Sequence, residues 1–348
     1  MTTAPRTLTA DRGDAGLRLD LVLRRHLTDV DAASRTRVQS WIENGRVTVN
    51  GSLVRRVSSR AAFGDRVTVM LPDSAPRRRM SAEDVRLDVL YEDEHLLAID
   101  KPAGIVVHPG YGHAGGTVMN ALLWHARGWQ DIERPSIVGR LDKLTSGIVV
   151  VAKTAGLHAR LQRAMASADC EKDYLAVVYG RVNVPRGQIA LRLTRDRGDR
   201  RKVVASATVG APSLTKFERI ARVMAPPVGL SLLRCRLVTG RTHQIRVHLA
   251  ARGWPLVGDP VYGEPARATS IVDAGLAAAV KAFSRQALHA WRVAFTHPMT
   301  GDRLSLEARV PSDLDGLLNA SGLTIPQRYR QPDDGRGTDQ RPDAGRRS

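Results

Sequence analysis

The stretch GRLDKLTSGIVVVAKT (residues 139–154) joins a short charged segment to an uninterrupted apolar run. The apolar run is short and rich in valine, and this pattern predicts a buried β-strand. Asp142 lies just before that strand, between Arg140 and Lys143. A carboxylate in this position could be a nucleophile, a general base or half of an ion pair, and the residue type alone favours the ion pair.

Segments on both sides of this strand alternate between β-branched runs and helical patterns. LDVLYEDEHLLAIDKP (residues 87–102) predicts a pair of strands, and LLRCRLVTG (residues 232–240) predicts another strand. A helix is expected from about Thr242 to Arg252. Thr242 would be a good N-cap, and Gly253 suits the position after a helix end.

Two further side chains, Tyr174 and Arg246, carry groups that could act in catalysis but are more often structural. Tyr174 lies in an apolar stretch, where packing in a core is expected, and Arg246 lies in the predicted helix, where an exposed cation is expected. His243 and His248 are separated by about 140° around a helix, so they do not share a face and a bidentate metal site is disfavoured. The sequence contains no GxxxxGK[ST] or paired-cysteine motif. It therefore predicts a site without metal or cofactor.

The charge balance indicates a polyanionic partner. Lys and Arg number 53 against 35 acidic residues, which gives a net charge of +18 and a pI near 10.9. Such an excess favours contact with phosphates. A preference for Arg codons would explain Arg over Lys, but not the net charge.

The remaining composition is that of a cytoplasmic protein. No apolar run approaches the length that crosses a bilayer, and the N-terminus lacks the apolar stretch of a signal peptide. Cys170 and Cys235 form neither a disulfide framework nor a metal-type spacing.

The N-terminal part is expected to contain a flexible arm over residues 1–14, a compact unit over 15–72 and a Pro-, Ser- and Arg-rich linker over 73–85. Within the unit, one helix is expected from about Leu17 to His26. A second follows Ser34 as N-cap and ends at Asn44-Gly45. RVTVNGSLV (residues 46–54) predicts a hairpin that turns at Asn50-Gly51.

This unit resembles the S-four-type RNA-binding module over about residues 16–72. The resemblance rests on Arg18-Leu19-Asp20, Ser34-Arg35, Gly45-Arg46-Val47 and Val49-Asn50-Gly51. It implies contacts with RNA shape and phosphate rather than with base edges. The basic side chains expected to make these contacts are Arg18, Arg35, Arg37 and Arg46.

The larger part of the chain, about residues 86–310, resembles the RluA/RluD-type large-subunit pseudouridine synthases. Blocks in a common order carry this resemblance: DKPAGIVVHPG (100–110), GRLDKLTSGIVVVAKT (139–154), EKDYLAVVYG (171–180), LVTGRTHQIRVHLAARGWPLVGDPVYG (237–263) and RQALHAWRVAFTHPMTG (285–301). The resemblance implies an α+β catalytic domain over 86–322 with a mixed, mostly antiparallel sheet. Residues 323–348 are expected to form a disordered tail, because its last part has almost no apolar residues.

The resemblance also assigns roles to residues. Asp142 would attack the nucleotide or assist cleavage of the N1–C1′ bond, after which the uracil rotates and rejoins through C5. Arg246 would pair with Asp142 and keep it ionised and oriented. Tyr174 would stack on the target base or accept the C5 proton. Arg140 would enter the RNA when the base flips. Nearby RNA contacts are expected from Arg241, His243 and Gln244.

The chain departs from the family pattern at two positions beside the expected catalytic residue. Gly139 stands where the family usually has His, and Leu144 stands where it usually has Asp or another small polar residue. These departures leave open a catalytically impaired RNA-binding or ribosome-assembly protein of the same fold. A glycosylase, in which the base is lost rather than rejoined, is a second alternative.

The favoured hypothesis is an isomerase that acts on uridines in RNA, most of all large-subunit (23S-type) rRNA or its assembly intermediate. It would need no cofactor and no obligatory protein partner, and it would not associate with a membrane.

Overall fold

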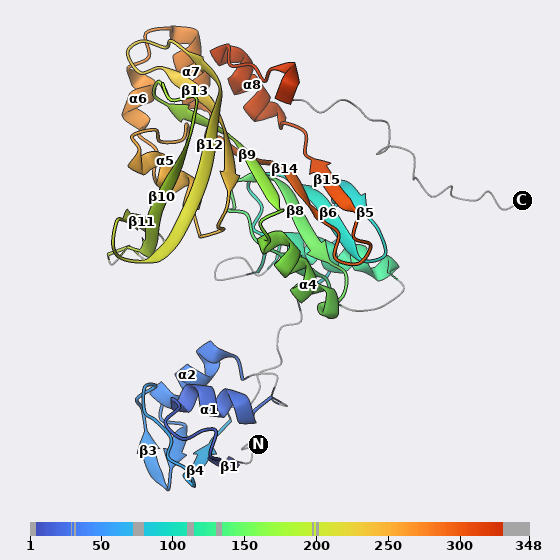
Figure 1. Cartoon of the computed structure of the whole chain (residues 1–348), viewed down its shortest axis with the longest axis vertical. Helices are drawn as coiled ribbons and strands as arrows, with labels where there is room; N and C mark the ends of the chain where they lie inside the picture. Colours follow the sequence, from blue (N-terminus) through green and yellow to red (C-terminus); the bar gives the residue numbers. More distant parts are fainter. Residues whose placement is uncertain are drawn as a thin grey trace, which may run out of the picture. The chain divides into compact units, whose positions relative to one another are not determined.

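The computed structural model describes residues 5–28, 30, 33–71, 80–109, 115–129, 134–196, 198–199 and 202–329 (Figure 1). The chain divides into two units, Met1–Arg79 and Met80–Ser348. Most of the expected linker, residues 73–79, lies outside the described residues.

The N-terminal unit packs two helices on a small antiparallel sheet. The helices are α1 (Leu19–His26) and α2 (Arg35–Glu43). The strands are β1 (Arg6–Thr9), β2 (Val47–Val49), β3 (Ser52–Val54) and β4 (Arg66–Val69), in the order β1-β4-β2-β3. Apolar side chains from both helices and from the sheet form one buried cluster. The predicted hairpin is confirmed: Asn50 and Gly51 both have positive φ, as a two-residue turn between twisted strands requires.

The expected flexible arm is wrong from Arg6 onward. Strand β1 pairs with β4, from Arg6 opposite Val69 to Thr9 opposite Arg66. Asp14 is fully buried and accepts hydrogen bonds from the side chains of Arg25 and His26. Alternation of polar and apolar residues over four positions is too short a pattern to separate an edge strand from an irregular arm. Residues 1–4 lie outside the described residues.

The larger unit is built on an 11-stranded sheet. Its strands are β5 (Val89–Glu92), β6 (Leu96–Lys101), β7 (Ser136–Val138), β8 (Ser146–Ala152), β9 (Glu171–Tyr179), β10 (Arg186–Arg195), β11 (Val203–Ser206), β12 (Ala211–Val223), β13 (Leu230–Leu237), β14 (Leu288–Thr296) and β15 (Arg303–Glu307). The order is β11-β10-β12-β13-β9-β14-β8-β6-β5, with β15 beside β14 and β7 beside β8. The pair β14–β8 is parallel and the other pairs are antiparallel, so the expected mixed, mostly antiparallel sheet is confirmed.

Helices cover both faces of this sheet (Figure 1). On one face, α4 (Ala155–Ala166) packs on β8 and β14, and α5 (Gln244–Ala251) packs near β9, β12 and β13. On the other face lie α3 (Val118–His125), α7 (Ala274–Ala282) and α8 (Ser312–Ser321). Shorter helical segments are η1 (Ala126–Gly128), α6 (Pro265–Thr269) and η2 (Gln327–Tyr329). The face between α4 and α5 is the one that carries the candidate site.

The packed part of the large unit extends beyond the expected range, residues 86–322, at both ends. Before it, Glu83 donates its backbone N–H to Asn120 O and its carboxylate accepts from Gly116 N, so residues 80–85 are packed rather than a linker. After it, Leu323 and Tyr329 are buried, and the Tyr329 hydroxyl lies 2.8 Å from Glu218. The expected disordered tail is therefore wrong for residues 323–329, because a single aromatic anchor outweighs the polar composition around it. Residues 330–348 lie outside the described residues.

Within the described residues, no helix is long and apolar enough to cross a lipid bilayer.

Candidate active site

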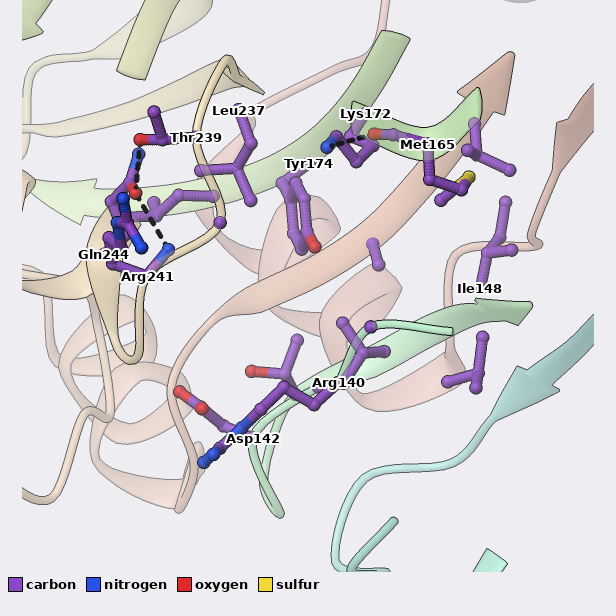
Figure 2. A pocket seen from close by; sticks show the side chains of 18 of the residues that line it. Arg140, Asp142, Ile148, Met165, Lys172, Tyr174, Leu237, Thr239, Arg241 and Gln244 are labelled. Carbon is purple, nitrogen blue, oxygen red and sulfur yellow. Dashed lines mark hydrogen bonds between the residues drawn. The ribbon is translucent and has the colours of Figure 1, made fainter. Parts of the chain in front are cut away.

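A cavity of about 480 Å³ opens on the sheet face between α4 and α5. Strands β8, β9 and β14 contribute its floor, and the ends of α4, α5 and the β7–β8 and β13–α5 loops contribute its walls. All the site residues predicted in this unit line it: Arg140, Asp142, Tyr174, Arg241, His243, Gln244 and Arg246. Figure 2 shows Tyr174 projecting from β9, while Arg140 and Asp142 belong to the loop before β8. A volume of this size suits a nucleoside-sized ligand.

The loop that carries Asp142 connects two adjacent strands, β7 and β8. Gly139 has a φ of +83° at its start, a conformation that side-chain-bearing residues rarely adopt. At its other end, Thr145 N donates to Asp142 O at 3.0 Å. Leu144 is one of the two departures from the family pattern. It is not among the described residues that line the cavity, whereas Leu141, Asp142 and Thr145 of the same loop are.

Buried cations hold the carbonyl groups of this loop. Lys101 Nζ donates to Lys143 O at 3.3 Å, and also to Pro102 O and Ile105 O. Arg285 Nη1 donates to Leu144 O at 3.4 Å and forms a two-bond ion pair with Asp313. These bonds hold the loop in one conformation without a ligand.

The environment of Lys101 disfavours its positive charge. Its residue is fully buried, and burial, with the nearby charge of Arg285, lowers its pKa to about 8, although Asp142 and Asp100 oppose the shift. Sequence reasoning missed both Lys101 and Arg285. For Lys101 a signal existed, since this lysine follows closely on the apolar run LLAI (residues 96–99) and is followed by proline.

Arg246 is not the exposed cation that its helical position suggested. It is 4% exposed, and its Nη1 donates to Asp142 Oδ2 at 2.9 Å. Its Nε and Nη2 donate to the two oxygens of Asp259 at 2.7 and 2.8 Å. Burial disfavours charge on this guanidinium, but the hydrogen bonds and charges of the two carboxylates outweigh burial and raise its pKa.

Asp259 is the second carboxylate of this network, and sequence reasoning did not identify it. It is buried and accepts further hydrogen bonds from the backbone N–H groups of Val261 and Tyr262. Burial alone would favour its neutral form, but these bonds and Arg246 hold its pKa below its usual value. The ring of Tyr262 lies against Arg246, with 5.0 Å between the guanidinium carbon and the ring centroid.

Tyr174 lies on β9 opposite Cys235 of β13 and Ala290 of β14. Burial raises its pKa, and the negative charge of Asp142 adds to the shift. The phenol is therefore protonated in the free protein. It offers a ring face and a hydroxyl to a base in the cavity, and it can act as a proton acceptor only after it has lost its own proton.

Helix α5 begins one residue later than an N-cap at Thr242 predicts. Its first residue is Gln244 and its N-cap is His243, which has a left-handed conformation with φ 55°. The predicted N-cap, Thr242, is therefore wrong. Buried Gln244 explains the late start: its side chain bonds to Thr239 Oγ1, Arg241 N, Leu214 O and Thr215 Oγ1 and so ties the loop to β12.

The predicted RNA contacts near the cavity separate into two groups. Arg140 and Arg241 are exposed at its rim. The polar atoms of Gln244 are occupied inside the protein, so the expected direct contact of Gln244 with RNA is corrected to a role in holding the loop. His248 is buried and bonds to Ser213 and Thr215, which agrees with its expected separation from His243.

In the N-terminal unit, Arg35, Arg37 and Arg46 are exposed, whereas Arg18 is partly occupied by a two-bond ion pair with Asp20. Among the described residues, Asp11, Asp14 and His26 form the one group of three side chains with metal-compatible spacing. Arg25 donates to both aspartates of this group, at 3.0 and 2.8 Å. A cation thus already neutralises the group, and its chemistry is that of an ion-pair network.

Two family models match this chain. Residues 95–251 match the model described as RNA pseudouridylate synthase, and residues 17–67 match the S4 domain, the S-four-type module. Curated relatives extend the similarity over both units. A ribosomal large subunit pseudouridine synthase D of Vibrio vulnificus is 38% identical over 308 residues, which cover 88% of this chain and 92% of the relative. A protein of the same name from Nitrosomonas europaea is 40% identical over 319 residues, covering 90% of this chain and 87% of the relative.

Solved structures show the same fold at lower identity. Human RNA Pseudouridylate Synthase Domain Containing 4 aligns with a TM-score of 0.53 and 21% identity over 69% of this chain and 94% of the human chain. Human RNA Pseudouridylate Synthase Domain Containing 1 aligns with a TM-score of 0.51 and 23% identity over 66% of this chain and 85% of the human chain.

Proposed function

This chain belongs to the RNA pseudouridine synthase family, and we propose that it isomerises specific uridines of large-subunit ribosomal RNA with Asp142 as the catalytic residue. The family makes it an isomerase that converts uridine to pseudouridine. The rRNA substrate is proposed because relatives that share almost the full length of the chain carry that substrate in their names. The reaction would take place in the cytoplasm, where the rRNA is assembled.

The observation that carries the assignment of Asp142 is its pairing with Arg246 inside the cavity. Arg246 donates to Oδ2 of the carboxylate, and the other oxygen, Oδ1, lies 3.8 Å from His243 Nε2. A carboxylate paired with a guanidinium beside a nucleoside-sized cavity can attack the nucleotide or stabilise the cation that forms as N1–C1′ breaks. The uracil then rotates and forms a C5–C1′ bond, and its C5 proton is replaced by a proton on N1, so that substrate and product are isomers.

The other cavity residues have roles that fit this reaction. Tyr174 offers its ring to the flipped uracil and keeps it near Asp142 during rotation. Arg140 and Arg241 at the rim would hold phosphates, and Arg140 would fill the space that the flipped base leaves. Arg18, Arg35, Arg37 and Arg46 of the N-terminal unit would bind phosphates of the same RNA. No step of this scheme requires a cofactor or a protein partner.

The test is a map of pseudouridine in 23S-type rRNA from a strain that lacks the gene. We expect specific positions to lose the modification, to regain it with the wild-type gene and to stay unmodified with Asp142→Asn. Unchanged modification in the deletion strain would refute the rRNA assignment. Restoration of the sites by Asp142→Asn would refute the catalytic assignment.

The catalytically impaired alternative predicts a different outcome: defective subunit assembly with no lost pseudouridine. This alternative rests on Gly139 and Leu144, the two positions at which the chain departs from the family pattern. Two observations favour the catalytic reading: Leu144 is not among the described residues that line the cavity, and Asp142, Tyr174 and Arg246 all line it.

A further inference from the structure

His243 has an unusual backbone conformation at the edge of the cavity. Among the described residues, His243 and Asn50 are the two non-glycine residues with positive φ, and Asn50 lies in a hairpin turn that requires it. His243 occupies the third position of the turn from Arg241 to Gln244, which Gln244 N–H closes on Arg241 O at 3.1 Å. Its conformation is imposed by the neighbouring Gln244, whose side chain and backbone tie the loop to β12 and to Arg241. Backbone strain that is maintained in this way is typical of functional sites.

The left-handed conformation directs the imidazole between two groups of the site. Its Nδ1 lies 2.9 Å from the hydroxyl oxygen of Tyr262. Its Nε2 lies 3.8 Å from Asp142 Oδ1, the carboxylate oxygen that Arg246 does not bind. A distance of 3.8 Å is longer than a hydrogen bond, but such contacts often shorten when substrate fills a site.

The hydrogen bonds of Tyr262 favour one ring nitrogen of His243 as the carrier of the proton. Val203 N–H donates to the hydroxyl oxygen of Tyr262 at 2.8 Å. The hydroxyl can then donate its own hydrogen to His243 Nδ1, which lies 2.9 Å away. An imidazole that accepts at Nδ1 is neutral and carries its hydrogen on Nε2. In this arrangement the N–H of His243 faces Asp142.

The charges around the ring are consistent with a neutral imidazole. Burial lowers the pKa of His243, and the positive charges of Arg246 and Arg140 act in the same direction. The carboxylates of Asp142 and Asp259 oppose the shift without reversing it. A neutral donor differs from an imidazolium in one respect that matters here: it orients Asp142 without adding a second positive charge to the carboxylate.

We propose that His243 is a positioning residue for Asp142, which Tyr262 holds in the neutral Nε2–H form so that one donor faces Oδ1 while Arg246 alone neutralises Oδ2. This inference rests on the proposed role of Asp142. It assigns a function to the strained backbone at His243 and to the hydroxyl of Tyr262.

The first measurement reads the tautomer directly. Nitrogen-15 NMR of the ring nitrogens, with the His243 signals assigned by their loss in His243→Gly, should show a neutral ring protonated at Nε2 near pH 7. An imidazolium or the Nδ1–H form at that pH would overturn the proposal. Because this measurement does not depend on turnover, its result stands even where the protein makes no pseudouridine, and failure of the two proposals can be told apart.

The second measurement is the single-turnover rate as a function of pH. Tyr262→Phe keeps a ring against Arg246 and removes the hydroxyl, so protonation of Nδ1 becomes easier and the acid limb of the rate should move to higher pH. His243→Gly keeps the left-handed backbone and should lower the rate about tenfold, the loss expected for one hydrogen bond. In the double variant the shift caused by Tyr262→Phe should vanish.

Tyr91→Phe is the matched control, because Tyr91 donates to Asp93, does not line the cavity and should leave the pH profile unchanged. Thermal melting of each variant checks its folding. Wild-type rates in His243→Gly, or the same acid-limb shift for Tyr262→Phe with and without His243, would overturn the proposal.

Discussion

Asp142 and Asp259 bind the guanidinium of Arg246 at the same time, Asp142 through one hydrogen bond of 2.9 Å and Asp259 through two bonds of 2.7 and 2.8 Å. Asp259 is buried and receives two backbone N–H groups, so it anchors the arginine to the protein. The remaining nitrogen of the guanidinium, Nη1, therefore has a fixed direction and donates to Asp142, the residue proposed to react. Such fixed charges cost no rearrangement during the reaction.

Replacement of Asp142 by asparagine is expected to lower the single-turnover rate at least about 10³-fold while RNA affinity changes little. The amide keeps the shape of the carboxylate and removes its charge. Pseudouridine formation at saturating enzyme and filter binding of the RNA separate the two quantities. Asp302→Asn, at an exposed carboxylate outside the cavity lining, serves as control. Substantial turnover by Asp142→Asn would remove Asp142 from its proposed role.

Arg246→Lys is expected to be milder than Arg246→Met, and both should impair catalysis more than RNA binding. Lysine retains the charge and loses the planar fork that binds two carboxylates. Methionine also leaves Asp259 buried without its cation, which should lower the free energy of unfolding by about 3–5 kcal/mol. Single-turnover rates and urea denaturation measure the two effects.

The double variant Arg246→Met/Asp259→Asn distinguishes catalysis from stability. It should recover part of the lost unfolding free energy, because no buried charge remains unpaired, but it should not recover the rate. Equal rates for the wild type and Arg246→Met would show that Arg246 does not act in the site.

Deletion of residues 1–79 is expected to weaken RNA binding and to reduce its salt dependence without abolishing isomerisation. Each phosphate contact contributes about 0.7–0.9 to the slope of log affinity against log salt, so loss of several arginines should flatten it. The full-length variant Arg35→Gln/Arg37→Gln should lower the slope by a smaller amount. An unchanged slope after deletion would assign the N-terminal unit another task.

Activity is expected to persist in EDTA and to need no added nucleotide or redox cofactor. The proposed chemistry uses a carboxylate, a phenol and a guanidinium, none of which requires a metal. Turnover of a pre-folded RNA with and without chelator measures this. Loss of activity that zinc restores, and magnesium does not, would contradict it; magnesium alone is uninformative because it folds the RNA.

Acidification is expected to destabilise the folded chain between about pH 6.5 and pH 4. Burial lowers the pKa of His248 to about 4 and that of His289 to about 4, whereas both would titrate near 6.5 when unfolded. In this window the unfolded state binds more protons, so the free energy of unfolding falls as pH falls, by roughly 3 kcal/mol for a fully buried histidine. Urea denaturation at several pH values measures the slope.

His248→Gln removes one of these titrating groups and should reduce the pH dependence. A slope equal to that of the wild type would show that His248 does not contribute to it.

The sequence by itself determined several local elements of this protein and pointed to the residues proposed for its chemistry. The valine run before Lys153 predicted a buried strand, and Asn50-Gly51 predicted the hairpin, because both signals lie within a few neighbouring residues. Ordered blocks of sequence then pointed to Asp142, Tyr174 and Arg246, which the fold brings to one cavity.

Only the tertiary structure decided how those residues are held. The bond between Arg246 and Asp142 joins residues 104 positions apart, and that between Arg285 and Leu144 joins residues 141 positions apart. Their geometry depends on the packing of the whole sheet, which no short window of sequence contains. The same reason explains why the anchor Asp259, the internal role of Gln244 and the left-handed His243 emerged from the structure alone: each depends on partners contributed by distant strands and loops.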